Sequence, residues 1–445
     1  MNILLISREY PPETAFGGIA TFVQLLARGL TAAGHRVVVI AQTFGAEREE
    51  TDALEPCVRV LRVAVPNAGP VHAMSVSLHL FAQLFARRVA RAAAELHATF
   101  PFDVLETPDH LAEGLHCLEF ARARRIPVVT RLYTPWSLLA RMGIELPGAD
   151  SPSDRAALGS MEEQLLHQSQ ALTAPSRDLA RRVQREYNLS SAIEFIPNPV
   201  DTERFRPRPA GAAAGGLSAT PALLFVGRLE DRKGCRDLPA LWAALRPRHP
   251  GLRLTILGPD TPNTGTPGLT MAAWLTAEFA RLGCAADLHN RHALPVDPDR
   301  MPPAGAVELI PRVSLEDLAR VYRAHDILLA PSRYDNSPYT VVEALASGLA
   351  VVATNAGGAP EYLGATSSVE PGRYQEGPGG RVVRPGDVAG LRAALEEPAG
   401  GWLIDAVALR AVQQAAREQA LRLCSPAQVA ADTLRLYARA QAMIF

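Results

Sequence analysis

The sequence predicts an α/β protein made of two doubly wound, Rossmann-like domains. Its 445 residues are too many for one ordinary core, and a hydrophobic content of 48% supplies enough apolar side chains for two. Short apolar runs alternate with segments of helical period, which indicates parallel sheets covered by helices. The alternation stops at residues 207–221, a segment rich in Gly, Ala and Pro, and then starts again.

The first domain is expected over residues 1–206. Residues 3–7 form its first predicted strand, a helix follows at 19–33, and residues 37–40 form the next strand. The helix places Phe22, Leu26 and Leu30 on one stripe, and Gly34 follows as a stop signal. Further strands are predicted at 58–65, 104–107, 127–132, 171–174 and 194–196.

Residues 207–221 are predicted to be a linker, and residues 222–425 a second domain of the same kind. Its strands are predicted at 222–226, 253–257, 307–310, 327–330 and 350–354, with helices between them. Residues 261–301 are interpreted as an inserted excursion around a helix near 271–282, and residues 426–445 as a helix that packs back on the first domain. Open α/β sheets bind ligands at the carboxyl ends of their strands, so the two domains are expected to face a central cleft.

Charge and cysteine content exclude several classes of protein. The 45 basic and 46 acidic residues give a formal charge of -1, which offers no overall attraction to nucleic acid. The five cysteines lack zinc-site spacing and are interpreted as small buried residues in a reducing compartment. No apolar stretch approaches the roughly 18 residues of a membrane span, so a cytoplasmic protein is expected. Arg87, Arg88 and Arg91 fit either a solvated helix face or a weak peripheral contact with an anionic membrane.

Two glycine-rich loops are candidate ligand contacts. Gly17 and Gly18 precede a predicted helix, whose N–H groups and dipole suit an anion such as a diphosphate, although simple turn glycines are an equal alternative. The G-x-G-x-x-G fingerprint is missing, which argues against a dehydrogenase. Gly358 and Glu361 lie in a second such loop, where the backbone can approach a polar ligand.

Arg228 and Lys233 form a basic cluster just after the first strand of the second domain. Two cations at this place can neutralise a diphosphate, whereas the acidic neighbours Glu230 and Asp231 favour an ordinary solvated loop. Lys233 is the single lysine among the 45 basic residues. A compact ammonium kept in so arginine-rich a chain indicates that a guanidinium does not fit there.

Asp335 and Glu343 lie in a predicted loop and in the helix that follows it. The helix begins near Pro338–Thr340, where its N-terminus can meet a phosphate. Carboxylates are strong acceptors for sugar hydroxyls, so an acid on either side of this helix start suits a sugar ligand. In the alternative interpretation, Asp335 is a helix cap and Glu343 is a satisfied buried acid.

Five motifs occur together in the order typical of the retaining GT-B glycosyltransferases of family 4, and the chain resembles this family over nearly its whole length. The motifs are the E-Y-P-P loop before Gly17-Gly18, the T-A-P-S turn at 173–176, the I-P-N-P-V-D-T-E-R-F passage at 196–205, the loop at 227–234 and the segment at 331–348.

The resemblance implies roles for the second-domain residues. Arg228 and Lys233 would hold the donor diphosphate, and Glu343 would bind the nucleotide ribose. The backbone at Ser337, Pro338, Tyr339 and Thr340 would meet the phosphates.

Three further positions bear on the donor. Asp335 stands where the family usually has a glutamate that faces the donor sugar. Tyr133 occupies the place of a common histidine, where its hydroxyl would contact the sugar. Ile310 precedes Pro311, a position where members often have a glycine beside the nucleotide base.

The resemblance therefore implies a retaining hexosyltransferase that takes a nucleotide-diphosphate sugar and needs no metal or cofactor. The D-x-D string at 297–299 is interpreted as a loop. The acceptor stays open among glycan, lipid-linked and small-molecule classes, and no oligomeric state is indicated. The alternatives are a catalytically silent nucleotide-sugar-binding or scaffold relative and an epimerase-like or phosphorylase-like enzyme of similar fold.

Overall fold

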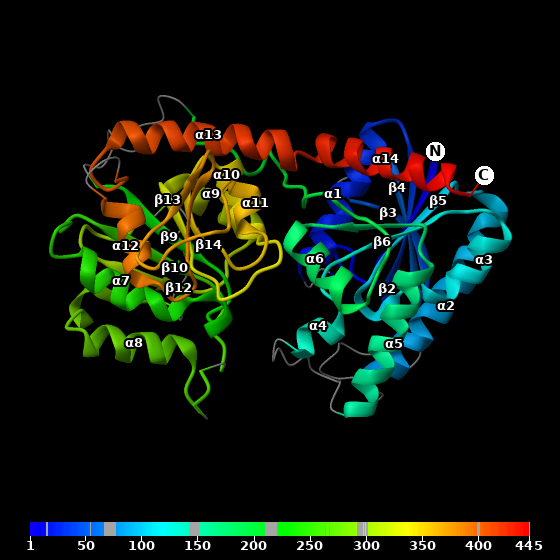
Figure 1. Cartoon of the computed structure of the whole chain (residues 1–445), viewed down its shortest axis with the longest axis horizontal. Coiled ribbons are helices and arrows are strands. Elements are labelled where there is room, and N and C mark those ends of the chain that lie inside the picture. Colours follow the sequence, from blue (N-terminus) through cyan, green and yellow to red (C-terminus); the bar gives the residue numbers. More distant parts are fainter. Residues whose placement is uncertain are drawn as a thin grey trace. The chain divides into compact units, whose positions relative to one another are not determined.

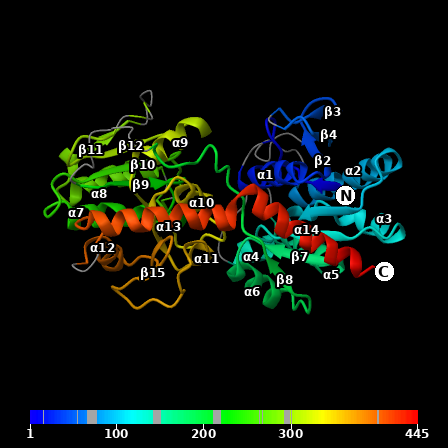
Figure 2. The same cartoon turned by 90° about the horizontal axis from the view of Figure 1, so that it is seen from above.

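The computed structural model divides into two compact units, drawn in Figures 1 and 2. The first unit consists of Met1–Pro199 together with Pro426–Phe445, and the second is Val200–Ser425. Val200 and Phe205 belong to the second unit because they pack in its core. The structure describes all residues except 15–16, 54, 66–76, 142–150, 210–219, 263, 267, 292–296, 298, 300, 398–400 and 445. Most of the predicted linker at 207–221 thus lies outside the described residues.

The first unit contains an eight-stranded sheet in the order β3-β4-β2-β1-β5-β6-β7-β8. Its strands pair in parallel, except that β3 runs antiparallel to β4. The strands are β1 (Asn2–Ile6), β2 (Arg36–Thr43), β3 (Arg48–Thr51), β4 (Val58–Ala64), β5 (Val104–Pro108), β6 (Val128–Arg131), β7 (Ala171–Ala174) and β8 (Ile193–Phe195).

Helices cover both faces of this sheet. Ile3 and Leu5 pack with side chains of α1 and α14 on one face, because alternate residues of a strand point to opposite sides. Leu4 and Ile6 pack with α2 and α5 on the other face. The helices are α1 (Gly18–Ala32), α2 (Leu78–Thr99), α3 (Leu118–Ala123), α4 (Trp136–Arg141), α5 (Pro152–Gln168), α6 (Arg177–Glu186) and α14 (Pro426–Ala442).

The second unit contains another eight-stranded sheet, in the order β11-β12-β10-β9-β13-β14-β16-β15. Only β15 runs antiparallel to its neighbour. The strands are β9 (Ala222–Val226), β10 (Arg253–Leu257), β11 (Leu288–Asn290), β12 (Val307–Ile310), β13 (Ile327–Ala330), β14 (Ala350–Thr354), β15 (Gln375–Gly377) and β16 (Gly380–Val383). The strand order reverses between β9 and β13, and ligands of open α/β sheets bind at such a point.

The second sheet is also covered on both faces, as Figure 1 shows. Side chains of α7, α8 and α12 pack on one face, and those of α9, α10, α11 and α13 pack on the other. The helices are α7 (Leu238–Leu245), α8 (Met271–Arg281), α9 (Leu315–Ala324), α10 (Tyr339–Ala346), α11 (Ala359–Leu363), α12 (Val388–Glu396) and α13 (Ala406–Cys424). None of the helices in the described part of the chain is long and apolar enough to span a membrane.

The C-terminal helix α14 packs in the first unit. Gly29 of α1 permits a close approach, since a Cβ there would lie 2.5 Å from the carbonyl oxygen of Pro426. The Tyr437 hydroxyl of α14 donates a hydrogen bond of 2.6 Å to the buried Glu106 carboxylate of β5. An apolar stripe and one buried polar contact therefore hold this helix against the first sheet.

The two sheets are parallel as predicted, except that one edge strand of each runs antiparallel to its neighbour. The antiparallel strands β3 and β15 read R-E-E-T and Q-E-G, and such polar edge strands carry no apolar signal. The expected excursion at 261–301 also contains β11, which extends the sheet beside β12. Four cysteines are buried as predicted, but Cys57 is exposed in the turn before β4.

Candidate functional site

The loop after β9 packs against the loop after β13 through a glycine. Gly234 has a φ of +73°, and a Cβ on it would lie 1.9 Å from the carbonyl oxygen of Pro331. Only glycine allows both this backbone conformation and this approach. The 3₁₀ turn Asp231–Lys233 comes directly before it. The local backbone thus places the basic cluster beside the segment that carries Asp335.

Lys233 forms an ion pair with Asp335 across these two loops. The two side chains are only 19% and 15% exposed, so water screens the pair little. Burial acts to raise the pKa of Asp335, but the positive charges of Lys233 and Arg232 outweigh it and hold that pKa below its usual value. Arg232 itself donates a hydrogen bond of 2.8 Å to Glu230.

Asp335 is fixed by its backbone as well. Its N–H donates to the carbonyl of Ala356 at 3.3 Å, and its own carbonyl accepts from Gly358 N–H at 3.0 Å. Gly357 between them has a φ of +100°, and a Cβ there would lie 2.0 Å from the Asp335 carbonyl oxygen. The glycine-rich loop after β14 therefore acts as a backbone clamp on Asp335.

Helix α10 begins directly after this segment. Pro338 precedes the helix and supplies no side-chain cap, and an anion can take the place of a cap at a helix N-terminus. The hydroxyls of Ser337 and Tyr362 lie 2.6 Å apart and form a hydrogen bond. This bond connects the residues just before α10 to α11. The helix start, including Tyr339 and Thr340, lies within a few residues of the Lys233–Asp335 ion pair.

Glu343 lies buried on α10 beneath this helix start. The Tyr322 hydroxyl donates to Glu343 Oε2 at 3.0 Å and lies 3.2 Å from the carbonyl oxygen of Thr340. Burial raises the pKa of Glu343 to about 8, with Tyr322 and Arg204 acting in the opposite direction. The two acids thus differ in charge: Asp335 is ionised beside a lysine, whereas Glu343 readily holds a proton.

Arg333 and Asp237 form a second ion pair between the same two loops. Both terminal nitrogens of Arg333 donate to the two oxygens of Asp237 at 2.8 Å, and Arg333 N–H donates to the Arg232 carbonyl at 2.7 Å. The sequence alone does not mark five further residues as part of the site: Arg333, Asp237, Tyr322, Tyr362 and Gly357. The R-Y-D run and the glycine pair at 357–358 were visible, but which partner each residue meets depends on the packing.

The remaining predicted residues of the second unit lie around this cluster. Arg228 is the most exposed of them, at 59%, and lies 3.4 Å from Glu230. Gly358 precedes α11, and Glu361 lies in its first turn. Ile310 is the last residue of β12, and its side chain is buried in the core. Only its backbone can therefore contact a ligand at this end of the strand.

The other three predicted residues lie in the first unit. Gly17 and Gly18 begin α1, where a Cβ on Gly17 would meet no atom within 4 Å. Tyr133 follows β6, and its ring makes an edge contact with Phe22 at 5.8 Å between centroids. Its N–H donates to Asp109 at 2.8 Å. Phe22 lies about one helical turn after Gly18, so the structure places Tyr133 near the start of α1.

The second-unit cluster can hold a charged, hydroxylated ligand. Lys233, Arg228 and the α10 N-terminus offer positive charge or N–H donors to an anion, and the Asp335 carboxylate accepts hydroxyl hydrogens. Among the described residues, no group of three or more His, Cys, Asp or Glu side chains has an arrangement that could hold a metal ion. Asp299 of the D-x-D string instead pairs with Arg320.

Sequence profiles of two families match the two halves of the chain. The profile of Glycosyltransferase Family 4 covers residues 16–204, and that of Glycosyl transferases group 1 covers residues 220–398. Together the two profiles span most of the chain. The chain is a glycosyltransferase of family 4 and group 1. Its membership is consistent with the ion pair and helix start described above, which lie within the second match.

Relatives and solved structures of known type resemble this glycosyltransferase over most of their length. It is 29% identical to the D-inositol 3-phosphate glycosyltransferase of Nocardiopsis dassonvillei over 363 residues, which are 79% of this chain and 76% of that protein. Sucrose-phosphate synthase from Thermosynechococcus elongatus superposes with a TM-score of 0.68 at 20% identity, covering 99% of both chains. The Anabaena protein HepE in complex with UDP gives 0.65 at 15% identity, covering 99% and 100%. The fold is thus the GT-B fold.

Proposed function

We propose that this glycosyltransferase moves a sugar from a nucleoside-diphosphate sugar to an acceptor hydroxyl, with retention of anomeric configuration and without a divalent metal or other cofactor. The observation that carries the proposal is the contact of Lys233 with Asp335 beside the start of α10. One cation, one ionised acid and one uncapped helix end lie together, and these suit a diphosphate joined to a sugar.

Each predicted residue of the second unit then has a role. Arg228 and Lys233 bind the donor diphosphate together with the backbone from Ser337 to Thr340. Glu343 accepts hydrogen bonds from the ribose hydroxyls. Asp335 and the loop with Gly358 and Glu361 face the donor sugar. The backbone near Ile310 lies by the base. For Gly17, Gly18 and Tyr133 of the first unit, a role in donor binding stays a prediction.

The chemistry in this proposal is electrostatic. The bond between the anomeric carbon and the diphosphate oxygen breaks as the acceptor oxygen bonds to that carbon on the same face. The acceptor proton passes to the leaving diphosphate. Arg228, Lys233 and the dipole of α10 stabilise the negative charge that develops there, and preorganised charges of this kind often provide the largest part of a rate enhancement.

The donor nucleotide and the acceptor are the parts to identify. A structural neighbour binds UDP and a relative is named for inositol 3-phosphate, which favours a UDP-sugar and a small-molecule acceptor as first trials. Glycan and lipid-linked acceptors are the next classes to test, because a family-wide resemblance does not extend to the acceptor.

The deciding experiment is calorimetry with UDP-, GDP- and ADP-sugars in the presence of EDTA. We expect tight binding of one donor that is lost in Lys233→Ala and Glu343→Ala, each titrated at a temperature at which its unfolding curve shows the variant to be folded. Arg281→Ala on the exposed side of α8 is the matched control and should bind normally. Proton NMR of the product then reports the anomeric configuration. Donor binding without transfer to any acceptor would instead favour a silent relative, and an absolute need for a metal ion would overturn the metal-independent mechanism.

A weak membrane contact is a further part of this proposal, carried by α2. Leu80 and Leu84 are 46% and 37% exposed, and Arg87 and Arg91 continue the same helix face. Arg88 is held by Glu47 at 2.6 Å and contributes less. We expect sedimentation with phosphatidylglycerol vesicles that falls in the double variant Arg87→Gln/Arg91→Gln. Equal sedimentation of both proteins would contradict the contact.

A further inference from the structure

A cavity lies in the second unit, at the amino ends of the strands of its sheet. It has a volume of about 650 Å³, which suits a small organic ligand. Ala222 and Arg253, the first residues of β9 and β10, line it together with Asp326, which precedes β13. The candidate donor cluster follows the other ends of β9 and β13. A five-residue strand spans about 16 Å, so the cavity and the donor loops are separate places joined by the same strands.

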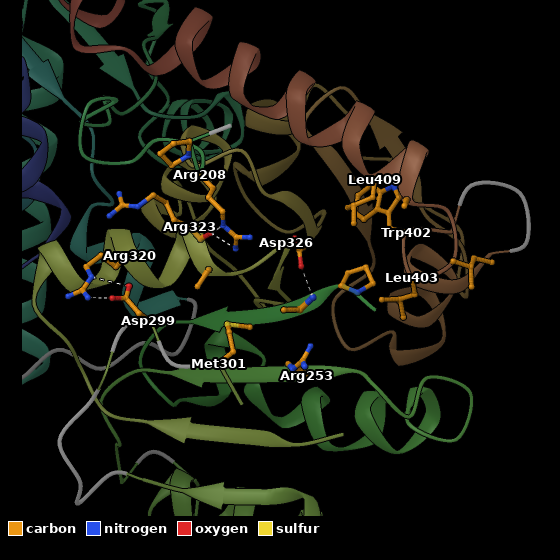
Figure 3. Close-up of a pocket in the computed structure, with 16 residues that line it drawn as sticks. Arg208, Arg253, Asp299, Met301, Arg320, Arg323, Asp326, Trp402, Leu403 and Leu409 are labelled. Carbon is orange, nitrogen blue, oxygen red and sulfur yellow. Dashed lines mark hydrogen bonds and ion pairs between the residues drawn. The ribbon is translucent and has the colours of Figure 1, made fainter. Parts of the chain in front are cut away.

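Four arginines but only two acids line this cavity: Arg208, Arg253, Arg320 and Arg323, with Asp299 and Asp326. Figure 3 shows Arg208, Arg320, Arg323 and Asp299 at the left of the view, whereas Arg253 lies apart from them at the bottom. Arg320 is neutralised by Asp299 and Asp317 at the rim.

Arg208 and Arg323 are held differently. Arg208 donates two hydrogen bonds to the Arg323 carbonyl, at 2.9 and 3.1 Å, and Arg323 donates to the Arg204 carbonyl at 3.1 Å. Within the described part of the chain, neither of these two arginines forms an ion pair. Carbonyl oxygens fix the position of a guanidinium without cancelling its charge, so both charges stay available to an anion.

Asp326 does not neutralise the arginines fully. Its Oδ2 accepts the N–H of Ala222 at 2.8 Å, a contact drawn in Figure 3. Burial raises the pKa of this carboxyl, with Ala222 N–H, Arg208 and, more weakly, Arg253 acting in the opposite direction. One oxygen of this acid is thus already bound to the backbone of Ala222.

The opposite wall of the cavity is apolar. Trp402, Leu403, Ile404 and Leu409 line it, as Figure 3 shows for the three that it labels. Ile404 is 58% exposed, whereas Trp402, Leu403 and Leu409 belong to the apolar core of the unit. A ligand with an anionic group at one end and an apolar body at the other suits this lining.

We propose that this cavity is a second ligand site, which binds a small phosphate monoester with an apolar or aromatic body through Arg208 and Arg323. A phosphate monoester carries close to two negative charges at neutral pH and accepts the N–H groups of several guanidiniums at once. The site stands on its own geometry and does not depend on the proposed transferase activity.

Calorimetry with phenyl phosphate tests the site, with inorganic phosphate as the bare anion and AMP as a nucleotide. We expect phenyl phosphate to bind the full chain at least tenfold more tightly than inorganic phosphate does. Arg208→Gln and Arg323→Gln should each weaken binding roughly tenfold, as expected for the loss of a charged hydrogen bond. Ala324→Phe, which fills the cavity and leaves both arginines in place, should abolish it.

Two control variants separate this site from other binding. Arg281→Gln lies outside the cavity and should bind phenyl phosphate normally, as should Lys233→Ala, which disables the donor cluster. AMP binding that is lost in Lys233→Ala but kept in Arg208→Gln belongs to the donor cluster. The proposal is overturned if phenyl phosphate fails to bind, binds no better than inorganic phosphate, or still binds Ala324→Phe. Unfolding midpoints identify any variant that fails to fold. If Ala324→Phe does not fold, phenyl phosphate binding to Arg208→Gln and Arg323→Gln decides whether the cavity is the binding site.

Discussion

Lys233 and Asp335 form an ion pair that joins the loop after β9 to the loop after β13. The single lysine of the chain thus holds in place the acid that is proposed to face the donor sugar. A diphosphate at Lys233 and a sugar at Asp335 would be bound by one coupled pair and not by two independent side chains.

The first prediction is that substitutions of this pair are not additive. Lys233→Ala leaves the Asp335 carboxylate mostly buried without its lysine, so we expect it to lower the free energy of unfolding by about 1–3 kcal/mol. Asp335→Asn in the same chain should restore part of that loss. A double-mutant cycle measured by chemical unfolding gives the coupling energy. Strictly additive effects would mean that the two side chains do not interact in solution.

The second prediction is that the shape of the ammonium matters as well as its charge. Lys233→Arg keeps the charge but places a planar, wider group between the two loops. We expect it to weaken donor binding at least tenfold while it changes the unfolding midpoint less than Lys233→Ala does. Donor titrations of both variants check this. Donor affinity unchanged in Lys233→Arg would show that the lone lysine is a chance of composition.

The third prediction concerns Glu343 and pH. Its pKa is raised to about 8 in the folded chain, from an ordinary value of 4.5. Between these values the folded state holds a proton that the unfolded state releases, so this group makes the free energy of unfolding fall as pH rises, by at most about 1.4 kcal/mol per pH unit. Glu343→Gln removes this titration and should flatten the fall between pH 5 and 8.

Other buried acids titrate in the same range, so the comparison needs a control. Burial also raises the pKa of Glu113, in the first unit, to about 8. Glu113→Gln should therefore flatten the same pH dependence without a change in donor affinity, whereas Glu343→Gln should change both. Parallel stability curves for Glu343→Gln and the unaltered chain would show that the carboxyl is ionised throughout.

The fourth prediction tests the backbone clamp on Asp335. Gly357→Ala would place a Cβ 2.0 Å from the Asp335 carbonyl oxygen at a φ of +100°, so the loop after β14 must move away. We expect donor binding to fall at least tenfold and the free energy of unfolding to fall by about 2 kcal/mol or more. Gly265→Ala also has a positive φ, at +72°, but meets no atom within 4 Å, so it should cost about 1 kcal/mol and leave donor binding intact. Equal effects of the two variants would argue against the clamp.

The sequence predicted the central strands and the residue types of the site because both have local signals. β9 and β13 read A-L-L-F-V and I-L-L-A, and their burial on both faces of the sheet makes them continuous apolar runs. The basic cluster and the two acids were identified by their places after these strands. The sequence does not predict the edge strands β3, β11 and β15 or the short strand β16 beside β15, because short segments with few apolar residues take their strand conformation from a neighbour.

The contacts within the site could not be predicted in the same way. Nothing local to Lys233 names Asp335 as its partner, since the two are 102 positions apart and meet only when β9 and β13 lie side by side. Likewise, the protonation of Glu343 depends on burial beside Tyr322 from α9. Residue type is a local property, whereas partners and pKa values are properties of the packing.

The last prediction is that Arg333 positions the donor loops through Asp237. Two parallel hydrogen bonds of 2.8 Å join the side chains, and Asp237 is only 9% exposed. Arg333→Ala leaves this acid without its partner and releases the loop that carries Asp335. We therefore expect a loss of about 1–3 kcal/mol in the free energy of unfolding and a weaker donor affinity. Arg333→Lys should restore little, because an ammonium cannot form the paired contact.

Arg246→Ala is the matched control for Arg333→Ala. Arg246 lies 2.7 Å from Asp287, an acid that is equally buried at 8% exposed, but neither residue belongs to the loops after β9 or β13. Its loss should lower stability by a similar amount while the donor still binds normally. Unfolding and donor titrations on the two variants separate positioning from stability. If Arg333→Ala and Arg246→Ala weaken donor binding equally, the effect comes from general destabilisation and Arg333 has no positioning role.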